Sequence, residues 1–154
     1  YSQIDGLGSD SEVLIAFGAL YNFHAVQDTR GICPTGWHVP TGEEWNNLID
    51  FAGGINFAGG NLKSTRTEPD THPRWDSPNE GAVDMYNFSA LPGGERDGDG
   101  PIFGLGAWGC WWSSTIVNST PPVPLHHVIF NNNEIIDSPP ASYWDGFSIR
   151  CIKD

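Results

Sequence analysis

The most regular spacing of apolar positions lies just after Thr41. Glu44 follows three residues later, and this arrangement is a capping box, in which each side chain pairs with the other residue's backbone N–H. The apolar residues that come next recur at helical intervals on one face, and they are Trp45, Leu48, Ile49 and Ala52. Because paired glycines favour the end of a helix, the pattern predicts an amphipathic helix between Thr41 and Gly53-Gly54.

On either side of this helix the apolar positions are less regular. Residues 12–26 are rich in apolar side chains, and we interpret them as one or two strands broken near Gly18. Residues 1–11 are polar and glycine-rich, so we expect residues 1–17 to form an N-terminal arm and the first strand. Residues 55–63 predict a second short helix.

The second half of the chain predicts short strands rather than helices. It is preceded by a long polar loop at residues 64–86, in which Trp75 is the expected packing anchor. Short apolar runs at 88–91, 110–114 and 146–152 predict strands. Strands that follow segregated helices indicate an α+β domain, with a short antiparallel sheet, one or two helices and long ordered loops.

Residues 115–145 do not follow this scheme. The segment contains five prolines, two adjacent histidines, a run of three asparagines and scattered apolar residues, but its apolar positions follow neither a period of 2 nor one of 3.6. We therefore expect much of it to lie outside the ordinary core. Two packed strands that bracket such a segment suggest a rigid scaffold that presents a contact surface.

Length and charge narrow the class of protein. The chain has 154 residues, enough for one domain with a sizeable core. A net charge of −12 argues against partners that are nucleic acids and against docking on an anionic membrane. No apolar run reaches the length of a membrane span, so we expect no direct insertion into a membrane.

The three cysteines cannot all pair within the chain. They are Cys33, Cys110 and Cys151, and no two have the spacing of a zinc site. A bridge between Cys33 and Cys151 would close a long loop and tie the end of the chain to its body. Three buried thiols in a reducing compartment remain the alternative, and the sequence does not decide between them.

No group of residues nominates a catalytic or metal site. No nucleophile elbow of the Gly-x-Ser-x-Gly type is present. Asp97-Gly98-Asp99-Gly100 matches only half of a calcium-binding loop, and a simple glycine turn is the favoured interpretation. His126 and His127 would point to opposite faces of a strand, so we expect an exposed contact histidine rather than a metal pair. We predict no cofactor, no metal and no enzymatic activity.

A set of motifs in fixed order carries a family resemblance. The set comprises GALYNFHAV at 18–26, GICPTGWHVPT at 31–41, EEW at 43–45, AGGNLK at 58–63, FSALPGG at 88–94, GLG at 104–106, WWSST at 111–115 and GFSIRCIKD at 146–154. Over residues 18–154 the chain resembles the Fibrobacter succinogenes major paralogous domain. The resemblance implies a C-type-lectin-like fold of the formylglycine-generating-enzyme type, on surface or secreted proteins of Bacteroidetes-like bacteria, without established catalysis. The reactive cysteine pair of such an enzyme has no matching pattern here.

The matching motifs stop at Thr115 and resume at Gly146. Some proteins of the implied fold are variable proteins of diversity-generating retroelements, in which randomised template adenines exclude Lys, Glu, Gln, Met and Trp from the varied positions. Between residues 115 and 145 only Glu134 and Trp144 fall outside the permitted set. We therefore expect 115–145 to be a variable region, whereas an ordinary divergent loop is the alternative.

These observations favour a non-enzymatic ligand-binding module, a hypervariable receptor or adhesin. We expect it to be extracellular, on a bacterial surface or on a phage particle. A protein is the favoured ligand and a glycan the alternative; an undiversified structural or glycan-associated module is the rival function. The residues expected to contact the ligand are Val117, Asn118, Pro122, Pro124, Leu125, His127, Ile129, Ile136, Asp137, Pro139, Ala141, Tyr143, Trp144 and Asp145.

Overall fold

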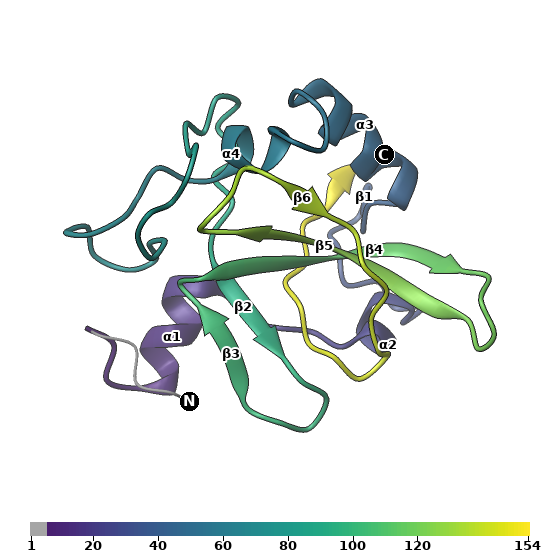
Figure 1. Cartoon of the computed structure of the whole chain (residues 1–154). Coiled ribbons are helices and arrows are strands. Elements are labelled where there is room, and N and C mark those ends of the chain that lie inside the picture. The colour runs from purple at the N-terminus through teal and green to yellow at the C-terminus, as the bar shows by residue number, and fades with distance from the viewer. Residues whose placement is uncertain (1–5) are drawn as a thin grey trace.

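A five-stranded sheet in the order β3-β2-β4-β5-β6 runs through the centre of the molecule (Figure 1). The computed structural model describes residues 6–154. Strands β2 and β4 are parallel to each other, and every other neighbouring pair is antiparallel. A second, two-stranded sheet pairs β1 with β7 near the C-terminus. The strands are β1 (Trp37–His38), β2 (Gly93–Arg96), β3 (Ile102–Leu105), β4 (Trp108–Val117), β5 (Val123–Phe130), β6 (Ile136–Asp137) and β7 (Ile152–Lys153).

The helices are short and lie in the first half of the chain, which confirms the α+β class. They are α1 (Asp10–Phe17), α2 (Phe23–Val26), α3 (Gly42–Phe51) and α4 (Ala58–Leu62). Their number exceeds the one or two that the sequence predicts. Helix α3 is the predicted amphipathic helix: Thr41 and Glu44 form a complete capping box, and Gly53 and Gly54 follow with positive φ angles.

The strands predicted over residues 12–26 are wrong. Helix α1 occupies residues 12–17 of this stretch and ends at Gly18, where φ is 84°, and helix α2 occupies residues 23–26. It begins because the Ser9 hydroxyl accepts a hydrogen bond from the backbone N–H of Glu12. The spacing Ser-x-x-Glu at residues 9–12 is thus a start signal that outweighs the local β-forming residues. The N-terminal arm expected at 1–11 falls partly outside the described residues, because residues 1–5 are not described.

The closing strand predicted at 146–152 is shorter than expected, since only its last residue belongs to β7. Phe147 forms an isolated bridge with Tyr21, and Ser148 forms one with Trp111. The segment therefore changes pairing partner along its length instead of following one neighbour. The short strand predicted at 88–91 is likewise reduced to one isolated bridge, between Ala90 and Lys63.

The core lies on both faces of β4 and β5. Successive residues of a strand point to opposite faces, so Trp111 and Trp112 enter different clusters. One cluster lies against α3 and α4 and contains Trp45, Ile49, Ala52, Ala58, Leu62, Trp75, Ala90, Trp111, Ile129 and Ile136. The other lies against α2 and contains Phe23, Val39, Cys110, Trp112, Val128 and Phe147. Tryptophans thus fill the interior of a loop-rich chain.

The long loop at 64–86 is anchored as predicted. Trp75 is fully buried, with 0% of its surface exposed, and its Nε1–H donates to the carbonyl oxygen of Ala90 at 2.9 Å. Lys63, just before the loop, is also fully buried. Its ammonium donates to the carbonyl oxygens of Glu80, Phe130 and Asn133 at 2.6–3.1 Å. Burial lowers the pKa of Lys63 to about 8.

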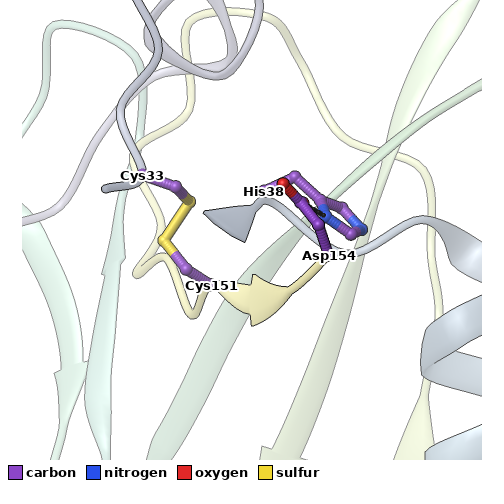
Figure 2. The surroundings of a disulfide bond; sticks show 4 residues. All are labelled: Cys33, His38, Cys151 and Asp154. Carbon is purple, nitrogen blue, oxygen red and sulfur yellow. Dashed lines mark hydrogen bonds and ion pairs between the residues drawn. A yellow bond between two sulfur atoms is a disulfide. The ribbon is translucent and has the colours of Figure 1, made fainter. Parts of the chain in front are cut away.

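Two of the three cysteines form a disulfide. Cys33 and Cys151 are bridged across a sequence separation of 118 residues, whereas Cys110 is a buried thiol. Figure 2 shows the bridge beside the paired strands β1 and β7, where His38 Nδ1 lies 2.6 Å from Asp154 Oδ1. The bridge and these strands together tie the C-terminal segment to the region that precedes α3.

Candidate functional site

The segment 115–145 divides into a buried strand and exposed connections. Strand β5 lies between β4 and β6, so its backbone is paired on both sides and both of its faces are covered. The expectation that the segment lies mostly outside the core is therefore wrong for β5. A strand buried on both faces lacks the alternation of a half-buried strand, and this explains the missing period.

Four of the fourteen predicted contact residues are buried and cannot meet a macromolecular ligand in this conformation. They are Pro124, His127, Ile129 and Ile136. Ile129 and Ile136 are 0% exposed and belong to the cluster beneath α3 and α4. These residues form the core because β5 and β6 run through the centre of the domain instead of crossing its surface.

The two adjacent histidines point to opposite faces of β5, as predicted, but the expected exposed histidine is wrong. The His126 ring stacks on Phe147 with centroids 4.2 Å apart, and the His127 ring stacks on Trp45 at 4.5 Å. Burial lowers the pKa of each imidazole to about 4. Both side chains are therefore neutral packing groups at neutral pH.

The hairpin between β4 and β5 carries a first exposed group. Val117, Asn118 and Pro122 are exposed around its tip, which projects from the body of the molecule (Figure 1). The Ser119 hydroxyl donates to the carbonyl oxygen of Pro121 at 2.6 Å and closes the turn. Leu125, further along β5, is half-buried.

The segment 139–145 carries a second exposed group beside the first residues of β5. Ala141 N–H donates to the Pro124 carbonyl oxygen at 2.9 Å, and Leu125 forms a bridge with Pro140. Within the segment, Ser142 N–H donates to Asp145 Oδ2 at 2.8 Å. Pro139, Ala141, Tyr143 and Asp145 are half-buried, whereas Trp144 is exposed. Asp137, another of the predicted contact residues, is exposed in β6, two residues before this segment.

Trp144 is the largest exposed side chain of this surface, with 62% of its area accessible. Its ring meets the His24 ring edge to face, with centroids 4.7 Å apart. The neighbouring Tyr143 ring packs against Phe23 at 5.4 Å, and its carbonyl oxygen accepts from Phe23 N–H. Helix α2 therefore supports the turn, although nothing in the sequence indicated that His24 would lie beside Trp144.

The acidic turn between β2 and β3 lies next to this aromatic group. The turn between β2 and β3 passes close to Trp144, since a Cβ added to Gly98 would lie 3.7 Å from the Trp144 Cβ. Burial, with the nearby charges of Asp145 and Asp97, raises the pKa of Glu95. Arg96 donates from Nε to the carbonyl oxygen of Gly100 and is a cation in the same turn. We call the turn at 139–145, with its exposed Trp144, the aromatic surface.

Among residues 6–154, no cluster of three or more His, Cys, Asp or Glu side chains is placed to hold a metal ion. Within the same range, no helix has the length and apolar character needed to cross a membrane.

Comparison with known families decides the relationship of the chain. Residues 6–153 match the sequence model of the Fibrobacter succinogenes major domain. The chain belongs to this family. The match begins twelve residues before the motif at 18–26, so α1 is part of the Fibrobacter succinogenes major domain. No curated protein and no solved structure matches the chain significantly.

Glycines of this Fibrobacter succinogenes major domain leave room for the connection between β5 and β6. In the motif at 58–63, a Cβ on Gly59 would lie 2.6 Å from the carbonyl oxygens of Glu134 and Ile135. On Gly81 a Cβ would lie 2.2 Å from Glu134 Cγ. The β5–β6 connection is thus seated on glycines, and Glu134 belongs to the frame despite its place inside 115–145.

Proposed function

We propose that this domain is a non-enzymatic ligand-binding module of C-type-lectin-like fold, and that it binds through the aromatic surface. The observation that carries the proposal is a large aromatic side chain held in the open. Trp144 is 62% exposed, yet it packs against His24 and lies in a turn closed by Ser142 and Asp145. A tryptophan that loses little freedom on binding is a typical energetic anchor of an interface.

The division of the tryptophans supports this assignment. Trp45, Trp75, Trp111 and Trp112 are buried and fill the core, whereas Trp144 takes no part in either core cluster. Its side chain can therefore meet a partner without loss of the fold. Isolated exposed apolar residues are common on proteins, but one that is fixed by aromatic contacts is a better candidate for recognition.

A protein is the ligand class that fits this surface best. The chain carries a net charge of −12, Asp145 follows Trp144 directly, and Asp97 precedes Gly98, whose backbone lies next to Trp144. Such a surface steers and selects a partner with basic side chains, and an Arg or Lys can also stack on the indole ring. The Cys33–Cys151 bridge supports an oxidising location, such as a bacterial surface, the extracellular space or a phage particle.

Retroelement diversification is part of the proposal in a narrowed form. Buried β5 and β6 residues cannot vary freely without loss of packing, so variation would be confined to exposed and half-buried positions. Those positions are Val117, Asn118, Pro122, Leu125, Asp137, Pro139, Ala141, Tyr143 and Asp145. Glu134, which the adenine rule cannot produce, is a framework residue.

The coding sequence tests this narrowed form. We expect a template repeat near the gene that differs from the coding strand only at template adenines, in codons of these exposed positions. Absence of a repeat, or differences spread over buried codons, would favour the rival, an undiversified structural or glycan-associated module. The exposed Trp144 ring is also compatible with the glycan-associated module, since aromatic rings stack on sugars.

Binding itself is tested by site-directed photo-crosslinking on cells or particles that carry the protein. A photoreactive residue in place of Trp144 should capture one defined protein partner. The matched control is Ile15, which is 82% exposed on α1 and outside the aromatic surface. Equal capture at both positions, or capture at neither while a glycan array gives specific binding, would refute a protein-binding aromatic surface.

A further inference from the structure

A concave site lies between α3 and the C-terminal segment. It is a hollow of about 330 Å³ lined by Pro40, Glu44, Trp45, Leu48, Phe88, Arg150, Cys151 and Ile152. None of these residues belongs to 115–145, so the hollow is independent of the proposed function. Its volume is at the lower end of the range for small-molecule sites, which indicates a small ligand or a single side chain.

Arg150 is the cation of this hollow, and it is only partly satisfied by the protein. Its guanidinium carbon lies 4.1 Å from the centroid of the Phe88 ring, and Nη2 donates to the Ser89 carbonyl oxygen at 3.2 Å. Burial lowers the pKa of Arg150, and Asp84 is the acid that opposes this effect. Asp84 accepts hydrogen bonds from the backbone and hydroxyl of Ser89, so its oxygens already have partners.

The other charged group of the hollow is already engaged. Glu44 accepts hydrogen bonds from the backbone N–H and hydroxyl of Thr41, and its Oε1 lies 3.0 Å from His38 Nε2. The remaining lining is mostly apolar, with Trp45, Leu48 and Phe88 contributing the largest side chains. The hollow therefore offers one under-used planar cation next to an apolar wall.

We propose that this hollow binds a carboxylate carried on a small apolar group, such as the C-terminal residue of an apolar peptide or a short aryl or alkyl acid. The planar guanidinium of Arg150 receives the carboxylate, because its fork of donors matches the two oxygens. The apolar group lies against Trp45, Leu48 and Phe88. Binding removes apolar surface from water and gives the guanidinium a directly bonded carboxylate in one step.

The test is a titration followed by two-dimensional ¹H–¹⁵N NMR, with 3-phenylpropionate as the probe and 3-phenylpropionamide as its uncharged match. We expect saturable shifts of the Trp45 indole N–H and the Ile152 amide with the acid. The amide should bind about tenfold more weakly, because it loses the charge-assisted hydrogen bonds. Equal binding of the two probes, or no saturable shift up to about 20 mM, would overturn the proposal.

Two variants locate the site. Leu48→Trp fills the hollow and leaves Arg150 in place, so it should abolish the shifts. Arg150→Lys keeps the charge but loses the fork, and it should weaken binding of the acid at least about threefold and not that of the amide. Both variants must retain the Cys33–Cys151 bridge and the thermal midpoint of the wild type. Unchanged binding of the acid by well-folded Leu48→Trp would also overturn the proposal.

Discussion

Strand β5 and the turn at 139–145 are neighbours with similar composition and opposite roles. Both are rich in apolar residues and contain proline, and they are joined by the bridge between Leu125 and Pro140. In β5 the backbone is paired on both edges, and side chains such as Ile129 are sealed between packed elements. The backbone of the turn pairs with other elements at single positions, with β5 at Ala141 and with α2 at Tyr143, and Trp144 stays in solvent. Backbone pairing, more than residue type, thus separates framework from surface.

Removal of a core side chain from β5 should give the largest effect. Ile129→Ala should lower the free energy of unfolding by about 3 kcal/mol, because a buried methyl-rich side chain is replaced by a cavity. Urea unfolding followed by circular dichroism measures the loss. The control is Ile135→Ala, close in sequence but 44% exposed, which should change stability by no more than about 0.5 kcal/mol. Equal losses would contradict the framework role of β5.

Acidification should destabilise the protein, because the buried histidines of β5 resist protonation in the folded state. The folded protein holds the pKa of His126 at about 4, below its unfolded value of about 6.5, so the unfolded chain binds more protons between these values. The contribution of neutral His126 to the stability of the fold is fully present above pH 6.5 and is lost as the pH falls toward 4. The loss amounts to about 2 kcal/mol at pH 5.

His126→Phe keeps a ring on Phe147 and removes the titrating group. The stability difference between pH 7 and pH 5 should therefore shrink by about 2 kcal/mol in the variant. Chemical denaturation at the two pH values measures it, and a comparison between pH 7 and pH 8 should show no such difference between variant and wild type. A wild-type-like acid response in His126→Phe would mean that the imidazole is not buried in its neutral form.

Tyr143 should give an intermediate effect, since it stands between the two regions. Its half-buried ring packs edge to face on Phe23 at 5.4 Å. Tyr143→Ala should lower stability by about 1–2 kcal/mol, through the lost aromatic pair and the partial loss of buried surface. A loss as large as that of Ile129→Ala, measured by the same urea unfolding, would place the whole turn in the framework.

The smallest effect on stability should come from the residue with the largest proposed effect on binding. Trp144→Ala should change the free energy of unfolding by no more than about 0.5 kcal/mol, because the ring is mostly solvated. Affinity for the captured partner should fall at least about tenfold. Calorimetry of variant and wild type with the purified partner measures the loss. Strong destabilisation with unchanged affinity would reverse the assigned roles.

Local signals in the sequence were sufficient where a single residue type dictates the geometry. The Thr41–Glu44 capping box and the following glycines located α3, and Trp75 was recognised as the anchor of its loop. The bridge between Cys33 and Cys151 was one of two open alternatives, because burial of a thiol and pairing of a thiol leave the same residues in the sequence.

Features that depend on distant partners were not predictable in this way. Strand β5 looked aperiodic because α3 and α2 cover opposite faces, and that sandwich is a property of the tertiary fold. The segment at 146–151 was expected to be one strand, yet its pairing passes from Tyr21 to Trp111. For the surface, the exposed position of Trp144 was predicted, but its support by His24 comes from an element far away in the sequence.

The buried Lys63 gives the molecule an internal reporter of opening. The chain has two lysines, and Lys153 is exposed on β7 while the Lys63 ammonium is enclosed by three carbonyl oxygens. An amine-specific acylating reagent therefore meets Lys153 at once, but it reaches Lys63 only when the loops around residues 80 and 130–133 part. The ratio of the two labelling rates measures how often the domain opens locally around Lys63, where the loop at 64–86 contacts the end of β5.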